Sequence, residues 1–193
     1  MGSLIGVNYQ NIAHAGAQGA RAARSVPNPP GGKMHDYVPF YFAPRSPMLM
    51  AINGGKVAGC NLRQGDILHF ETTVPKMVAT NRSIVFYDRN ATLAYSVAYT
   101  DLTKLDTAVA WDLITEAPQL DGYCKWWSNR NDVAKYIDRM ERRQAEFLVK
   151  DMVPLSAMNR IGVFDDQRRT QVQHILEKAN VMLPVVAMPA WYF

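Results

Sequence analysis

The sequence predicts a single domain of the α+β class. Its 193 residues suit one domain at a prior of roughly 150 residues each, and a second domain fits only if both are small. Hydrophobic residues make up 48% of the chain, which is enough for a sizeable core. Short strands and helices follow one another irregularly, whereas a doubly wound fold alternates strand and helix. We therefore expect one domain over residues 1–193.

The first part of the chain predicts two helices around one strand. Residues 11–24 are rich in alanine and favour a helix, which the Pro- and Gly-rich run 27–32 then ends. Residues 37–42 (YVPFYF) are typical of a short strand. Pro39 has no N–H to donate to a neighbouring strand, so we expect this strand at a sheet edge or at a bulge. Ser46 followed by Pro47 predicts the start of a short helix through Met50.

The middle of the chain predicts two strands, at 66–73 and 83–87. A short helix is expected between them at 74–80, because Pro75 is tolerated in a first turn. Residues 91–131 are the least regular part, with one helix expected near 104–114.

The last part predicts two helices and three strands. A helix capped by Asp132 is expected over 132–143, because apolar residues recur there at helical spacing: Val133, Tyr136, Ile137 and Met140. A second helix is capped by Asp165 or Asp166, and its apolar stripe is Val172, Ile175, Leu176 and Ala179. The strands are expected at 145–149, 160–164 and 181–188. Pro184 marks the last of them as an edge strand or a bulge.

Composition and charge exclude several classes of protein. A net charge of +4 and a pI near 9.1 permit a nucleic-acid partner without requiring one. No run approaches the ~18 apolar residues of a membrane span, and the first residues do not resemble a secretory signal, so no membrane association is expected. The two widely spaced cysteines, Cys60 and Cys124, fit a reducing cytoplasm.

Several common catalytic motifs are absent from the sequence. None of the four histidines, His14, His35, His69 and His174, has another His or Cys at metal-ligand spacing, so no metal site is expected. There is no P-loop, no GxGxxG run and no GxSxG elbow. Hydrolases and Rossmann dehydrogenases are therefore disfavoured.

Gln144 and Glu146 form the first candidate site. They stand two residues apart at the start of an apolar strand, so their side chains project from one face. A carboxylate accepts a ribose hydroxyl and stabilises the positive charge that develops as a glycosidic bond breaks, while the amide holds the second reactant. The alternative is a helix end that runs into a strand, with Glu146 exposed to solvent. Spacing alone favours this alternative.

Two aromatic runs are the other candidates. Residues 35–45 (HDYVPFYFAPR) offer rings for stacking on a planar ligand; a packed core strand is the alternative, and it fits Phe40 and Phe42 better than Tyr37 and Tyr41. Residues 125–130 (KWWSNR) interleave aromatic, basic and amide groups. Such a run suits single-stranded nucleic acid, where stacking contributes about 1–3 kcal/mol per base. One buried and one half-exposed tryptophan is an equally good interpretation.

These runs resemble the signature of the DarT family. The similar residues are 31–49 (GGKMHDYVPFYFAPRSPML), 144–149 (QAEFLV) and 191–193 (WYF), and the resemblance extends from about Ile12 to Phe193. DarT proteins are bacterial toxins that ADP-ribosylate DNA. The resemblance implies an ADP-ribosyltransferase fold, with a split, mixed β-core, surrounding helices and a cleft that binds NAD as substrate.

The resemblance also implies a reaction and its partners. The family transfers ADP-ribose from NAD to a base in single-stranded DNA, typically thymidine in a short sequence context, and one branch prefers guanosine. A macrodomain antitoxin, DarG, removes the modification. We therefore expect single-stranded DNA and a DarG-like antitoxin as partners, in the cytoplasm.

Residue roles follow from the resemblance by position. Glu146 matches the catalytic glutamate, which orients the nicotinamide ribose and stabilises the oxocarbenium-like centre. Arg21 matches an active-site arginine that holds NAD phosphate or supports the incoming base. Tyr41 lines the nicotinamide pocket. The expected NAD-binding set is Arg21, Tyr41, Tyr37, His35 and Gln144.

The DNA-binding set lies on three segments. Arg45 and Met48 are expected beside the DNA, and residues 88–90 end a strand at the target base. Residues from about 106 to 135 form a loop that grips substrate. The expected DNA-binding residues are Arg45, Met48, Asp88, Arg89, Asn90, Lys125, Trp126, Trp127 and Arg130.

The chain departs from the family pattern at two places. Family members usually begin with a strand and a helix that carry a His-x-Thr motif for NAD, and we expect this chain to lack that segment and to bind NAD more weakly. Asn90 stands where some members have a histidine. One alternative function is therefore a single-stranded nucleic-acid-binding module without chemistry. Another is an RNA- or protein-modifying transferase, since a fold does not choose its acceptor.

Overall fold

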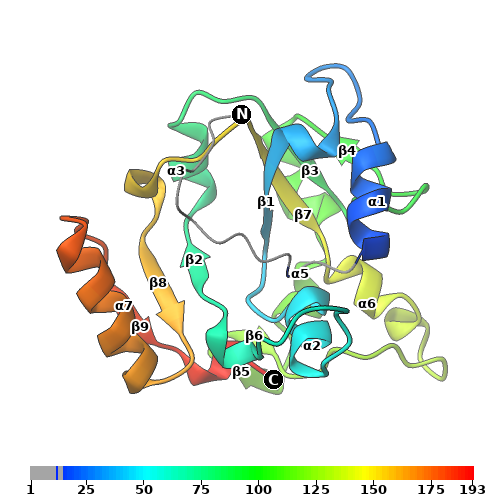
Figure 1. The fold of residues 1–193 in the computed structure, drawn as a ribbon. Helices are drawn as coiled ribbons and strands as arrows, with labels where there is room; N and C mark the ends of the chain where they lie inside the picture. The colour runs from blue at the N-terminus through cyan, green and yellow to red at the C-terminus, as the bar shows by residue number, and fades with distance from the viewer. Residues whose placement is uncertain (1–11, 13–14) are drawn as a thin grey trace.

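The computed structural model describes residue 12 and residues 15–193. Its centre is divided into two sheets that lie side by side, with helices around them (Figure 1). The prediction for the segment that precedes Ile12 falls on residues outside the described part of the chain. The α+β class is confirmed.

The larger sheet contains the strand order β1-β7-β3-β4, with all neighbours antiparallel. Its strands are β1 (Tyr37–Tyr41), β7 (Glu146–Lys150), β3 (Ile84–Tyr87) and β4 (Ala98–Tyr99). The register sets Glu146 between Tyr41 on one side and Tyr87 on the other. β1 is an edge strand, as Pro39 predicted.

The smaller sheet contains β2 (His69–Glu71), β8 (Arg160–Val163) and β9 (Val185–Ala187), in the order β2-β8-β9. β2 runs antiparallel to β8, whereas β8 and β9 are parallel and are joined through α7 (Asp166–Lys178). Asp165 is the N-cap of α7, and its Oδ1 accepts a hydrogen bond from the Arg168 N–H at 2.8 Å. This resolves the choice between Asp165 and Asp166.

Short helices and a hairpin complete the fold around these sheets. The predicted starts of α2 and α3 are confirmed, because Ser46 and Thr73 cap them and Pro47 and Pro75 lie in their first turns. The α-helices are α1 (Ala15–Ala23), α2 (Pro47–Asn53), α3 (Val74–Val78), α4 (Leu105–Ala108), α5 (Trp111–Ile114) and α6 (Arg139–Arg142). The hairpin is formed by β5 (Gln119–Leu120) and β6 (Tyr123–Cys124). Within the described part of the chain there are also six 3-10 turns: Met34–Asp36, Gln64–Asp66, Leu102–Lys104, Ala134–Tyr136, Leu155–Ala157 and Pro189–Trp191.

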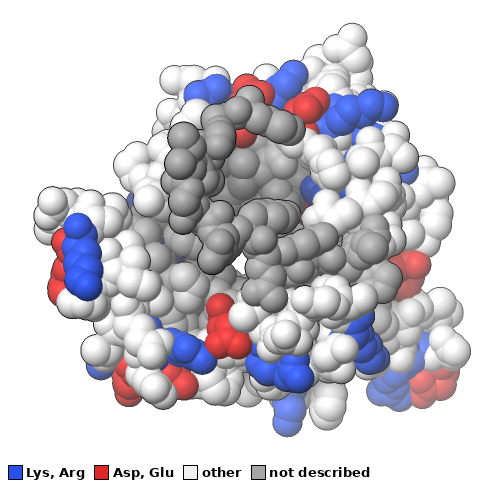
Figure 2. Space-filling view, viewed as in Figure 1, with Lys and Arg blue, Asp and Glu red and all other residues white. Residues whose placement is uncertain are grey.

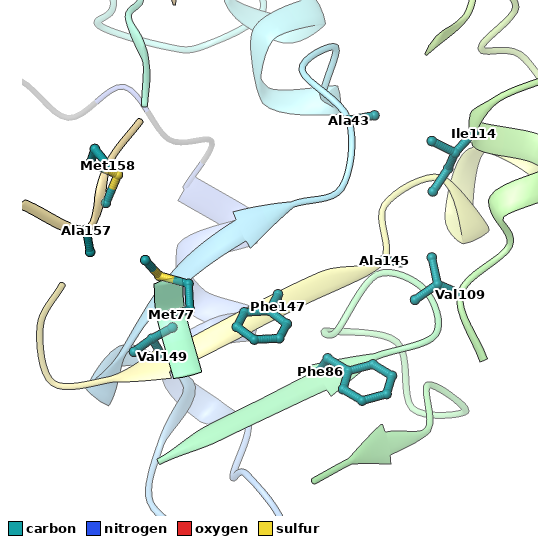
Figure 3. Packing of buried hydrophobic residues seen from close by; sticks show 10 residues of the cluster. All are labelled: Ala43, Met77, Phe86, Val109, Ile114, Ala145, Phe147, Val149, Ala157 and Met158. Carbon is teal, nitrogen blue, oxygen red and sulfur yellow. The ribbon is translucent and has the colours of Figure 1, made fainter. Parts of the chain in front are cut away.

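The larger sheet is buried on both faces. On one face Phe86 and Phe147 pack with Met77 of α3 and with Val109 and Ile114, as Figure 3 shows. On the other face the cluster is Val26, Met34, Tyr37, Val85, Tyr87, Ala91 and Leu148. β7 is therefore a central strand with packing above and below, which fixes the position of every side chain on it.

Three sequence predictions are wrong in detail. Residues 132–143 do not form one helix: a 3-10 turn and α6 are separated at Asp138, whose φ of −116° and ψ of 24° are not helical, and Ile137 is exposed. The helix near 104–114 is divided because Val109 is extended and buried in the core. On α7, Val172 is buried, whereas Ile175 of the predicted stripe is 64% exposed. In each case tertiary packing overrides the local pattern.

No described helix is long and apolar enough to cross a membrane. Cys60 and Cys124, both of them buried, are free thiols.

Candidate active site

A cavity of about 900 Å³ lies between β1 of the larger sheet and β2 of the smaller sheet. This volume lies within the usual range of small-molecule sites, roughly 300–1,000 Å³. The described residues that line the cavity are mostly apolar, and they come from α1, β1, α2, β2 and β7 among other segments. Figure 2 shows the same view of the surface, on which Lys and Arg are spread around the periphery and do not gather into one patch.

Glu146 is the most buried carboxylate at this site, with the residue only 1% exposed. Its Oε2 accepts from the Arg21 Nη1 at 2.6 Å, which is an ion pair, and its Oε1 accepts from the Ala91 backbone N–H at 3.3 Å. A buried carboxylate is stable only with such partners. The alternative of a solvent-exposed Glu146 is excluded.

Arg21, the ion-pair partner of Glu146, faces the cavity. It projects from α1, lines the cavity and has a side chain 15% exposed, whereas Glu146 is not part of the described lining. The Arg21 Nη2 is buried and has no hydrogen-bond partner among the residues that the structure describes. A free donor in this position is suited to an anionic group of a ligand.

Tyr41 also lines the cavity, opposite Glu146 in the β1–β7 register. Burial raises the pKa of the Tyr41 hydroxyl most, the Glu146 carboxylate raises it further, and Arg21 opposes them. Tyr41 as a residue is 37% exposed, because it stands at the open wall of the cavity. Its hydroxyl therefore stays protonated and can donate a hydrogen bond.

Gln144 and Glu146 both contact the loop that follows β3. The Gln144 Oε1 accepts from the Asn90 Nδ2 at 2.5 Å, and its Nε2 donates to the Met140 carbonyl at 2.8 Å. The Asn90 Oδ1 accepts from the backbone N–H and the hydroxyl of Thr92. Gln144 and Asn90 line the cavity beside Arg21, held in one orientation by this network.

Two residues of the expected NAD-binding set lie away from the cavity. Tyr37 is buried at the other end of β1, where its hydroxyl donates to the Gly31 carbonyl at 2.6 Å. His35 is exposed on the 3-10 turn before β1. Neither is in the described lining. The aromatic run in the sequence could not show which end of the strand meets the cavity, the end with Tyr41 or the end with Tyr37.

Asp88 and Arg89 belong to a network beside Asn90. The Asp88 Oδ1 accepts from the Val97 N–H at 2.9 Å, and Arg89 pairs with Asp88, Asp138 and Glu141 at 3.1, 3.4 and 3.9 Å. The Arg89 guanidinium also lies 5.5 Å from the Tyr95 ring centroid. These contacts tie the loop after β3 to α6.

The remaining DNA-binding candidates divide into exposed and buried groups. Lys125, Trp126 and Arg130 are exposed, and Met48 is 36% exposed on the cavity wall. Arg45 is only 5% exposed and donates to backbone carbonyls, so the structure corrects the expectation that it meets DNA directly. Trp127 is 6% exposed and packs edge-on against Phe193 at 6.3 Å. One buried and one exposed tryptophan was the alternative interpretation of this run.

Sequence reasoning missed the wall formed by the smaller sheet. His69, Phe70 and Glu71 of β2 line the cavity, and so do Tyr123 of β6 and Trp191 of the last 3-10 turn. Burial lowers the pKa of His69 from near 6.5 to about 4, so its imidazole is neutral at physiological pH. The strand at 66–73 was predicted, but no local signal identifies which of its residues meet a cavity formed with a distant strand.

Among the described residues, no three His, Cys, Asp or Glu side chains come together as a group that could hold a metal ion.

Comparison with known proteins identifies this arrangement. The family model described as "ssDNA thymidine ADP-ribosyltransferase, DarT" matches residues 2–193. A protein of Thermus aquaticus named "DNA ADP-ribosyl transferase" is 36% identical over 189 residues, which cover 95% of this chain and 75% of that protein. The chain belongs to the DarT family.

Solved structures agree with this assignment. Thermus sp. 2.9 DarT in complex with ADP-ribosylated ssDNA has a TM-score of 0.82 and 31% identity, covering 95% of this chain and 81% of that one. Thermus sp. 2.9 DarT in complex with NAD+ has a TM-score of 0.77 and 30% identity, covering 90% and 81%. The predicted family, fold and NAD-dependent ADP-ribose transfer to DNA are confirmed.

Proposed function

We propose that this chain uses the cavity between β1 and β2 to transfer ADP-ribose from NAD+ to a thymidine base of single-stranded DNA, with Glu146 as the catalytic residue. The observation that carries the proposal is the Glu146 carboxylate, which is buried on a central strand and paired at 2.6 Å with Arg21, a residue that lines the cavity. Membership of the DarT family supports the same reaction.

In the proposed reaction the bond between ribose C1′ and the nicotinamide nitrogen breaks. Nicotinamide leaves as a neutral molecule with the bonding electrons, and positive charge develops on the ribose. A nucleophilic atom of the base then bonds to C1′, and the base loses a proton. A fixed carboxylate such as Glu146 stabilises the positive charge and accepts a hydrogen bond from a ribose hydroxyl.

Arg21 has two roles in this proposal. Its unpartnered Nη2 suits a diphosphate oxygen of NAD+, and a bond to that anion would draw the guanidinium away from Glu146. The carboxylate would then be open to the ribose. Tyr41 supplies a protonated hydroxyl at the same wall, and Gln144 presents an amide beside it.

DNA is proposed to approach from the loop that contains Lys125, Trp126 and Arg130. The exposed Trp126 ring, with the Lys125 Nζ 5.5 Å from its centroid, suits a base and a neighbouring phosphate. Met48 and Asn90 line the cavity and would face the incoming base. Residues 106–135 would therefore act as the substrate-contacting part of a single domain.

The biological setting is proposed from the family. A DNA modification of this kind requires removal, and we assign that step to a macrodomain antitoxin of the DarG type that acts in the same cytoplasm. Co-expression of such a macrodomain with this chain should restore growth of a bacterial host, whereas a macrodomain unable to hydrolyse the modification should not.

The test of Glu146 is a substitution by glutamine, which keeps the shape and removes the charge. Transfer from labelled NAD+ to a thymidine-containing oligonucleotide should fall at least about 100-fold, the usual loss for a main electrostatic group. Glu177→Gln on α7 is the matched control and should retain full activity. Glu146→Gln activity within a few-fold of wild type would exclude the assignment, provided that the thermal unfolding curve shows an intact fold.

A further inference from the structure

Two buried arginines meet at one carbonyl group beneath the exposed Trp126. The Arg45 Nη2 donates to the Cys124 carbonyl at 2.9 Å, and the Arg143 Nη1 donates to the same oxygen at 2.9 Å. Arg45 also donates to the Lys125 carbonyl at 3.4 Å, and Arg143 to the Trp126 carbonyl. Three successive carbonyl groups, at 124–126, are therefore held by this arginine pair.

The arginine pair is unusual in its burial and its lack of counter-charge. Arg45 is 5% and Arg143 is 2% exposed, and among the described residues neither has a carboxylate partner. Burial lowers the pKa of both guanidinium groups, Cys124 opposes this shift in each, and the charges of Arg45 and Arg139 lower the pKa of Arg143 further. Burying two like charges costs free energy. Apolar side chains of similar volume at these two positions would therefore give a more stable fold.

The pair connects the two strands that carry the active site. Arg45 stands four residues after Tyr41 at the end of β1, and Arg143 stands three residues before Glu146 at the start of β7. The Arg143 guanidinium also lies 5.0 Å from the Trp127 ring centroid, which fixes the buried tryptophan beside the exposed one. Residues 124–127 are thus held by one arginine that follows β1 and by another that precedes β7, the two strands that carry Tyr41 and Glu146.

We infer that Arg45 and Arg143 are positioning residues, which set the Trp126 ring at a fixed distance from Glu146 so that a stacked base directs its neighbour into the cavity. This inference rests on the proposed function, because Trp126 is taken as the base-stacking side chain. It gives Arg45 a role through the backbone of the loop in place of direct contact with DNA.

The test is a set of steady-state measurements with a short thymidine-containing oligonucleotide. Trp126→Ala should raise the oligonucleotide KM about tenfold, the loss expected for one base stack. Arg143→Lys and Arg45→Lys, which keep the charge but lose the two-pronged donor, should each raise it by a similar factor, with the NAD+ KM within twofold of wild type. Arg169→Lys on α7 is the matched control and should change neither constant.

A double variant separates positioning from simple loss of stability. If Arg143 acts through Trp126, the Trp126→Ala/Arg143→Lys enzyme should be no worse than Trp126→Ala alone. Multiplied KM effects, or a fall in kcat with an unchanged oligonucleotide KM, would overturn the inference. Because lysine at either site could prevent folding, Asn129→Ala supplies an exposed variant: it removes the bond from the Met140 N–H at 2.8 Å and should raise the KM about two- to threefold.

The outcomes also distinguish this inference from the function on which it rests. A wild-type enzyme that modifies the oligonucleotide, with Trp126→Ala unchanged in KM, excludes the stacking contact and the inference with it while leaving transfer intact. A wild-type enzyme with no transfer to any single-stranded oligonucleotide contradicts the proposed function itself. An unchanged KM in Arg45→Lys, Arg143→Lys and Asn129→Ala, with Trp126→Ala impaired, excludes only the positioning role.

Discussion

The two sheets beside the cavity are built from different chemistry. The larger sheet holds charge: Glu146 is buried on the central strand β7, and Arg21 covers it from α1. The smaller sheet contributes the neutral imidazole of His69, the Phe70 ring and the half-exposed carboxylate of Glu71, which pairs with Arg160. The comparison teaches that the larger sheet buries its ion pair, whereas the carboxylate of the smaller sheet is half-exposed and its imidazole is neutral.

The difference has a structural cause. β7 is flanked by β1 and β3 and is packed on both faces, so a charge placed at its first residue is fixed and can be satisfied by neighbours on both sides. β2 is an edge strand of a smaller sheet, and a charge buried there would have fewer partners. The predictions below test this division, from the largest expected effect to the smallest.

Removal of the Arg21 charge should damage the larger sheet most. Arg21→Met leaves the Glu146 carboxylate buried without its ion-pair partner, and breaking such a pair costs about 3–5 kcal/mol of unfolding free energy. Urea unfolding measures the loss. The second substitution Glu146→Gln should recover a large part of it, because the amide needs no counter-charge. A loss below about 1 kcal/mol, or no recovery, would contradict the electrostatic account of this wall.

A methyl group at Gly162 should damage the smaller sheet by shape alone. A Cβ there would lie 2.5 Å from the Cζ3 of Trp191, a residue that is 4% exposed and whose Nε1 donates to the Asp121 Oδ2 at 2.6 Å. Gly162→Ala should therefore lower the unfolding free energy by about 2 kcal/mol, within the usual cost of overpacking. Gly19→Ala on α1 is the control of opposite sign, because its Cβ meets nothing within 4 Å and alanine favours a helix by about 0.5–1 kcal/mol. Equal stability of the two variants would be incompatible with this packing.

The neutral imidazole of His69 should appear as a pH dependence of stability. Its pKa is lowered to about 4 in the folded chain from near 6.5, so the unfolded chain binds the proton more readily. Stability should be unaffected above about pH 7 and should fall as the pH drops from about 6.5 towards 4, by at most about 3 kcal/mol. His69→Gln should remove this component, whereas His174→Gln on the exposed face of α7 should not. Identical pH profiles for wild type and His69→Gln would contradict the burial of the His69 imidazole in the folded chain.

The smallest effect concerns charge outside both sheets. If Lys125 contacts one DNA phosphate, Lys125→Gln should reduce the slope of log Kd against log salt concentration by about 0.7 for a single strand. Fluorescence anisotropy with a labelled oligonucleotide between 50 and 200 mM salt is the measurement, roughly the range over which such slopes are resolved. Lys178→Gln at the end of α7 is the control and should leave the slope unchanged. If Lys125→Gln gives the same slope as this control, the contact between Lys125 and a phosphate is excluded.

Much of the fold followed from local signals. Pro39 placed β1 at an edge, Ser46 and Pro47 set the start of α2, and Asp165 caps α7, because each of these rules depends on neighbouring atoms only. The prediction of one helix over 132–143 is wrong for a physical reason. Its residues are held by long-range bonds, such as the one from the Arg139 Nη2 to Glu116 at 2.7 Å, and these outweigh apolar periodicity.

The candidate site was predictable in part. The carboxylate and amide spacing singled out Gln144 and Glu146, yet spacing alone favoured an exposed Glu146, and only the resemblance to DarT reversed that preference. Arg45 was assigned to DNA by the resemblance to DarT, whereas the structure shows a buried guanidinium bonded to the Cys124 carbonyl. Residues of the smaller sheet, such as His69, could not be found, since their part in the cavity depends on how two distant sheets meet.

Intact mass spectrometry of oligonucleotides tests the central claim most directly. The wild-type chain is incubated with NAD+ and two single-stranded oligonucleotides of matched composition, one with a single thymidine and one without. The account predicts a mass gain of one ADP-ribose on the thymidine-containing strand only, and its absence with Glu146→Gln. Equal modification of both strands, or modification by Glu146→Gln at the wild-type rate, would contradict it.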